Sequence, residues 1–160
     1  MHRFLVPFRM HSTGWVLCAM CVAIGVWLGG WRLGLPIGFF LLVSLLLHEV
    51  GHMLMARLLW VPVREFGLRM AGAYNWRAYA TRRRDEILIS AAGPMMNLLL
   101  VVPVLFIPRI GAQLALGNLA LCLVNLLPIP SSDGLRILRT ALYSGGRGTW
   151  RSTLTVEAAR

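Results

Sequence analysis

The chain has 160 residues, of which 58% are hydrophobic and 14% are charged, and its net charge of +10 comes with sixteen Arg and no Lys. Long apolar runs alternate with short basic segments, which is typical of a polytopic helical membrane protein and not of a soluble domain of this size. The Arg residues cluster at the ends of the apolar runs, so we expect lipid headgroups as their partners and no nucleic acid.

The first predicted membrane span covers residues 15–31, with Trp15 and Trp31 at its ends as interfacial anchors. Arg3 and Arg9 precede this run, but no small-x-small cleavage site ends it, and further apolar runs follow. We therefore expect a retained helix and not a cleaved signal peptide.

The second predicted span, residues 36–59, carries His48, Glu49 and His52 in its middle. As a helix this stretch would be about 36 Å long, enough to cross the hydrocarbon core of a bilayer. Ionisable side chains at that depth are expensive, so a cluster of them indicates a functional site.

The spacing of these three residues indicates metal chemistry. His48 and His52 are four residues apart, so they lie on one face of a helix, one turn apart, where both imidazoles can reach one Zn²⁺. Glu49 occupies the general-base position of H-E-x-x-H metalloproteases. The alternative is a buried His pair that hydrogen-bonds neighbouring helices, but Glu49 would then need a partner of its own.

Residues 60–86 form the longest polar segment. Apolar residues from Val61 to Met70 alternate in part with Arg64 and Arg69, which predicts a short β-hairpin at the cytoplasmic membrane surface. Asp85 and Glu86 then begin the next helix, where the helix dipole favours acids.

The third predicted span, residues 87–107, contains Gly93, Pro94 and Asn97. Pro and Gly in a span kink it and free backbone groups that neighbours must satisfy. Asn97 is the polar residue of this span, and an interhelical hydrogen bond is at least as probable a role for it as direct participation in catalysis.

The fourth predicted span, residues 112–127, runs into a Pro-rich segment, residues 125–134, that ends in Asp133. Irregular backbone at membrane depth is tolerated where it is buried in protein or lines a wet cavity. Asp133 alone would be interpreted as the N-cap of a final helix. Next to an H-E-x-x-H pair that lacks a third ligand, we favour Asp133 as that ligand.

The distribution of Arg predicts the topology. Thirteen Arg lie in residues 1–14, in 60–86 and after 133, and Arg57 ends the second span on the same side, whereas only Arg32 and Arg109 lie on the other side. The positive-inside rule then places both termini in the cytoplasm, with four spans. We expect one membrane-embedded core, residues 1–143, and a flexible tail, residues 144–160.

Three motifs together resemble the site-2 protease family of intramembrane zinc metalloproteases. They are HEVGH at 48–52, AGPMMN at 92–97, and an N-x-x-P-x-P-x-x-D-G pattern at 125–134, in the order of the family. The resemblance covers residues 36–140, and the compact layout is most similar to the bacterial branch that processes sporulation factors. Ser131 and Ser132 stand where apolar residues or Pro are usual, and Leu135 stands where a second Gly is common.

The resemblance implies one Zn²⁺ per chain, bound by His48, His52 and Asp133, with water in the fourth position. It implies that Glu49 is the catalytic glutamate and that Asn125 helps to hold the substrate carbonyl. Asn97 is added as a candidate substrate-binding residue.

The function expected from the family is cleavage of membrane-anchored proteins in or near their transmembrane segments, in a bacterial inner membrane. A regulatory protein or a homo-oligomer would be an additional partner. The alternative is a catalytically silent membrane scaffold that retains a metal site. The intact Glu49 argues against it, because a structural site uses four protein ligands and needs no base.

Overall fold

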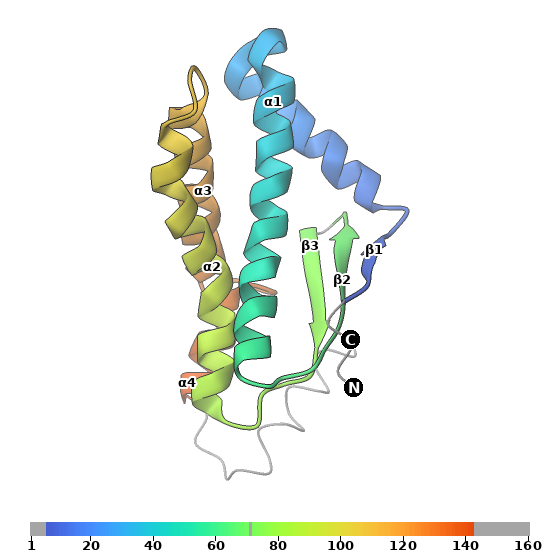
Figure 1. Cartoon of the computed structure of the whole chain (residues 1–160), viewed down its shortest axis with the longest axis vertical. Coiled ribbons are helices and arrows are strands. Elements are labelled where there is room, and N and C mark those ends of the chain that lie inside the picture. Colours follow the sequence, from blue (N-terminus) through green and yellow to red (C-terminus); the bar gives the residue numbers. More distant parts are fainter. Residues whose placement is uncertain (1–5, 71, 143–160) are drawn as a thin grey trace.

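The computed structural model describes residues 6–70 and 72–142, and within them the chain is mostly helical with one small sheet (Figure 1). The expected helical class is confirmed. The tail expected at 144–160 lies outside the described residues. In chain order the elements are β1 (Phe8–Met10), α1 (Gly14–Leu58), β2 (Val63–Arg69), β3 (Gly72–Arg77), α2 (Arg83–Leu105), α3 (Gly111–Leu126) and α4 (Asp133–Leu142).

Helix α1 consists of two arms that meet at a sharp kink (Figure 1). The kink lies at Gly30, whose φ of 63° and ψ of −176° are not helical and favour glycine. The arms pack closely, because a Cβ on Gly25 would lie 2.5 Å from the backbone nitrogen of Gly38. The two arms correspond to the first two predicted spans, but the turn is at Gly30 instead of just before Pro36, which lies inside the second arm.

The expected hairpin is present as β2 and β3, which pair antiparallel from Val63 opposite Arg77 to Arg69 opposite Gly72. The short strand β1 adds to β2 in parallel and makes the sheet order β1-β2-β3, a pairing the sequence did not predict. The sheet lies beside the second arm of α1, with β3 nearest to it (Figure 1). In the part of the chain that the structure describes, the outer edge of β3 pairs with no strand.

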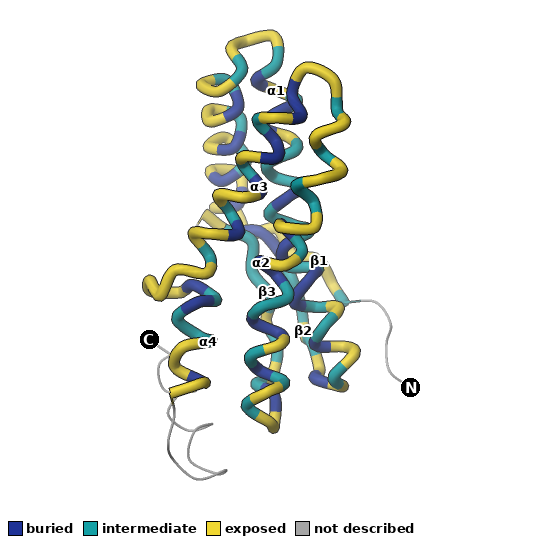
Figure 2. Tube along the Cα trace, turned by 90° about the vertical axis from the view of Figure 1, so that its left-hand side faces the viewer, coloured by how far each residue is buried: buried dark blue, intermediate teal, exposed yellow. Residues whose placement is uncertain are grey.

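Helices α2 and α3 pack against each other and α2 packs against α1, while α4 lies against α2 at the end where α2 begins (Figure 1). Among the described helices, α1 and α2 are long and apolar enough to cross a membrane, and α3 is apolar but has 16 residues. The outer sides of the helices carry exposed residues (Figure 2). Many of them are large and apolar, including Trp27, Leu99 and Phe106.

Candidate metal centre

The second arm of α1 carries His48 and His52 on one face, and both side chains are buried. Their rings meet edge to face with centroids 4.8 Å apart, and the two Nε2 atoms are 3.1 Å apart. The helical spacing of four residues therefore produces the convergence that the sequence predicts.

Helix α2 holds the other nitrogen of each ring. The Nδ1 atom of His48 donates to Oδ1 of Asn97 at 3.1 Å, and Nδ1 of His52 donates to the carbonyl oxygen of Ile89 at 2.6 Å. Because a carbonyl oxygen can only accept, each Nδ1 keeps its proton. Each Nε2 is then the atom that can exchange its proton for a metal ion, an arrangement common to metal-binding imidazoles.

Asp133 completes a triangle with the two imidazoles. Its Oδ2 atom lies 3.1 Å from Nε2 of His48 and 3.3 Å from Nε2 of His52. Ligand atoms at opposite ends of an edge of a zinc tetrahedron are about 3.3 Å apart when each bond is about 2.0–2.1 Å. The three atoms therefore fit three corners of a zinc site, and their chemistry, two imidazoles and a carboxylate, suits that metal.

The surroundings of Asp133 favour the ionised form of its carboxyl group. Burial works to raise its pKa, but the hydrogen bonds with His48 and His52 outweigh burial and lower the pKa to about 2. The group is therefore an anion at neutral pH, as a metal ligand must be.

Ser132, and not Asp133, caps helix α4. The hydroxyl of Ser132 accepts a hydrogen bond from the backbone N–H of Leu135 at 3.1 Å and donates to the carbonyl of Leu127 at 2.5 Å. This is the geometry of an N-cap with its N3 partner. The alternative role considered for Asp133 is thus filled by its neighbour, which leaves the carboxylate facing the imidazoles.

Glu49 lies next to the triangle on the cavity side. Its carboxylate and the imidazole nitrogens lie within 4.8 Å of one another, so Glu49 could compete with Asp133 as a ligand. The shorter distances favour Asp133 as the ligand. Glu49 and Asp133 both line a polar cavity of about 550 Å³, which Tyr74 and Asn75 of β3 also line. A carboxylate in this place can exchange a proton with water or substrate.

Gly93 allows α2 to approach the imidazoles. A Cβ at this position would collide with the ring of His52 and lie 2.7 Å from Nε2 of His48. Gly51 makes the reciprocal approach, since a Cβ there would lie 2.6 Å from the carbonyl oxygen of Ala92. The sequence suggested a kink at Gly93, whereas the contacts of Gly93 with the ring atoms needed the tertiary structure.

The two candidate asparagines occupy different environments. Asn97 is fully buried behind His48 and does not line the cavity, so its contact favours a role in orienting the ring. Asn125 donates to the carbonyl of Leu121 within its own helix at 2.9 Å and is also outside the lining of the cavity. Sequence reasoning missed the carbonyl of Ile89, because a backbone acceptor leaves no signal in residue type.

Comparisons with known proteins find similarity to zinc metalloproteases. Residues 37–112 match peptidase family M50. A zinc metalloprotease of Methanocaldococcus jannaschii is 31% identical over an alignment 159 residues long, gaps included. The alignment covers 92% of this chain and 46% of that protein. This chain therefore spans less than half the length of that relative. The structure of the site-2 protease from M. jannaschii has a similar fold, with a TM-score of 0.70 at 22% identity over 99% of this chain and 79% of that chain.

Proposed function

We propose that this chain, whose residues 37–112 match peptidase family M50, is a zinc metalloendopeptidase that cleaves membrane-anchored proteins in or near their transmembrane segments. The observation that carries the proposal is the triangle of His48, His52 and Asp133, with Glu49 beside it in a polar cavity. One zinc ion per chain fits this triangle.

Each residue has a defined task in this proposal. His48, His52 and Asp133 would hold the zinc, which would act as a Lewis acid that activates water and polarises the substrate carbonyl. Glu49 takes a proton from the attacking water and returns it to the leaving amine, because its carboxylate lies in the cavity next to the ligands. Asn97 orients His48 from behind. We also propose that Asn125 contacts the substrate, which would require its amide to break the hydrogen bond with the carbonyl of Leu121.

The substrate must be extended at the site, since a helix conceals its carbonyls in internal hydrogen bonds. The unpaired edge of β3 borders the cavity through Tyr74 and Asn75, and we propose that it receives the unwound substrate as an added strand. A Pro substitution can test whether a strand binds substrate in this way. Strand β2, including residues 66–69, is the central strand of the sheet, so a Pro placed there would break the sheet itself. The edge is therefore better tested in β3.

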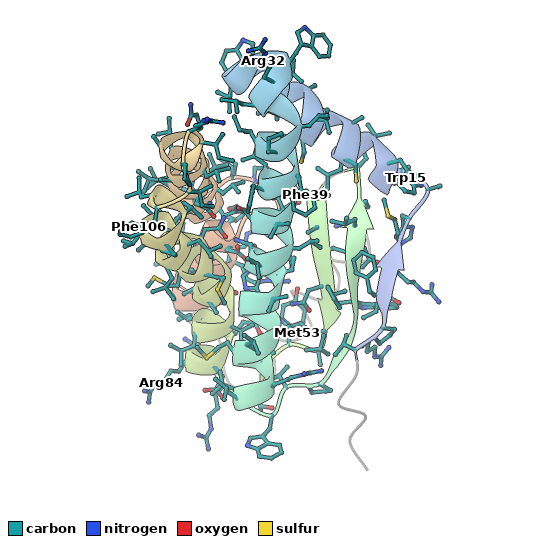
Figure 3. All side chains as sticks on the ribbon, turned by 45° about the horizontal axis from the view of Figure 1, so that its top comes forward. Trp15, Arg32, Phe39, Met53, Arg84 and Phe106 are labelled. Carbon is teal, nitrogen blue, oxygen red and sulfur yellow. The ribbon has the colours of Figure 1, made fainter. Side chains whose placement is uncertain are left out.

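We propose four membrane spans: the two arms of α1, then α2 and α3. Figure 3 shows Arg32 and Arg84 at opposite ends of the molecule, and Arg82 and Arg83 adjoin Arg84 in the chain. The end of Arg84 would face the cytoplasm, with both termini, in a bacterial inner membrane. Residues 1–143 would form one core, surrounded by lipid, and a regulatory protein or a second copy of the chain could join it.

The experiment compares the detergent-purified chain with its Glu49→Gln variant on a single-span model substrate, with zinc present. We expect cleavage by the wild type alone, with both proteins binding zinc. Zinc binding without cleavage by either protein would favour the silent scaffold. Equal cleavage by both would remove Glu49 from its proposed role.

A further inference from the structure

A second cluster of charged residues lies next to the metal centre, and the proposed reaction does not use it. The carboxylate of Glu86 has no exposure to solvent and accepts hydrogen bonds from both terminal nitrogens of Arg77, at 2.7 and 2.9 Å. The backbone N–H of Ala80 donates to the same carboxylate at 2.9 Å. The side chain of Arg77 is only 4% exposed, so this ion pair is buried.

The same carboxylate reaches helix α4. The Nε atom of Arg136 lies 3.7 Å from Oε1 of Glu86. The guanidinium of Arg136 also lies over the ring of Tyr79, 5.2 Å from its centroid, and contacts the hydroxyl of Tyr79 at 3.5 Å. Glu86 thus contacts the end of β3 through Arg77, and α4 through Arg136, from its own place in the first turn of α2.

Arg136 follows Asp133 by three residues, so the two side chains lie on the same face of α4, one turn apart. Asp133 is at the first residue of this ten-residue helix, and its carboxylate must stay close to both imidazoles to serve as a ligand. Functional geometry of this kind needs supporting contacts that hold it to within about 0.5 Å.

A buried ion pair is weak evidence for stability, because the desolvation of its two charges offsets their attraction. In some proteins such pairs are retained because they specify one geometry. Here the contacts of Glu86 with Arg77 and Arg136 connect β3, which lines the cavity, to the helix that carries Asp133.

We propose that Glu86 is a positioning residue for the metal centre: through Arg136 it sets the place of α4, and so the distance of the Asp133 carboxylate from His48 and His52. The inference rests on the proposed zinc site. Glu86 itself touches neither zinc nor substrate in this proposal.

The test measures zinc affinity of the detergent-purified chain by competition with a chromogenic chelator. Replacing a group that supports a ligand typically weakens metal binding by about 10–100-fold, and we expect a loss in this range for Glu86→Gln. The matched control is Glu65→Gln. Glu65 of β2 likewise contacts an Arg and a Tyr, Arg9 of β1 at 3.5 Å and Tyr74 of β3 at 3.1 Å, but both partners belong to the sheet and neither to α4. We expect its affinity for zinc to be unchanged.

A double-mutant comparison separates positioning from a general loss of structure. If Glu86 acts through Asp133, then Glu86→Gln should have little further effect on zinc affinity in a chain that already carries Asp133→Asn. An equal loss in both backgrounds would overturn the proposal, as would unchanged affinity in the single variant.

If Glu86→Gln does not fold, Arg136→Met serves instead, because it leaves the Arg77 pair intact and the Arg136 side chain is 39% exposed. We expect weaker zinc binding with the helical circular dichroism retained, and unchanged binding would overturn the proposal. Absence of zinc binding by the wild type would instead refute the proposed function, which is a different result.

Discussion

Nε2 of His48 lies 3.1 Å from Oδ2 of Asp133, although 85 residues separate them in the chain. The contact joins the second arm of α1 to the first residue of α4, and it adds a third possible ligand atom to the pair of imidazoles. The proposed metal site depends on this contact and on the packing that maintains it.

Replacement of Asp133 by Asn should remove the third ligand. We expect zinc affinity to fall by more than about 100-fold, because a neutral amide cannot supply the anionic oxygen that the two imidazoles leave to this position. In the wild type, zinc at about 100 times its dissociation constant should stabilise the fold by about 2.7 kcal/mol and raise the melting temperature. The variant should lose that shift. Asp85→Asn is the control, and a zinc-dependent shift that survives in Asp133→Asn would contradict the assignment.

Gly93→Ala should disrupt the site without changing any polar group. The added Cβ would collide with the ring of His52, so either the rings or α2 must move. We expect reduced zinc binding in a competition assay. Gly117→Ala is the control, since its Cβ meets only the end of the Leu41 side chain, at 2.9 Å, which can rotate away. Equal zinc affinity in the two variants would show that the close approach at Gly93 is unimportant.

Asn97→Leu should weaken zinc binding by about 10–100-fold, because it removes the acceptor that orients His48. Asn97→Asp, which keeps an acceptor at the same place, should retain most of the affinity. The control for loss of a buried amide is Asn118→Leu, because among the described residues Asn118 donates only to the carbonyl of Leu114 in its own helix. If Asn97 instead contacts substrate, Asn97→Leu will raise KM and leave zinc affinity unchanged.

Ser132→Ala should remove the cap of α4 and lower the free energy of unfolding by about 1 kcal/mol, since the N–H of Leu135 loses its acceptor. Thermal unfolding in detergent measures the change. Ser131→Ala is the control, because Ser131 is exposed and keeps its left-handed backbone, φ 67°, in either form. A larger loss in the control than in Ser132→Ala would place the cap elsewhere.

Much of the fold could be predicted from the sequence, because apolar run length and local spacing determine it. The helices begin and end within a few residues of the predicted spans, apart from the turn at Gly30 and the earlier start of α2. The convergence of His48 and His52 follows from four residues of helix alone, so the spacing was sufficient to predict it. The polar hairpin was likewise predictable, from the partial alternation of apolar and Arg residues between Val61 and Met70, which covers β2.

The remaining features depend on contacts between residues far apart in the chain. Whether Asp133 caps α4 or faces the imidazoles was decided by Ser132, which takes the cap, and by the position of α4 against α2. The addition of β1 to the sheet, the acceptors of the two Nδ1 atoms and the buried Glu86–Arg77 pair were likewise visible only in three dimensions. Local sequence determines which side chains share one helix face, whereas the packing of separate elements determines which of these faces meet.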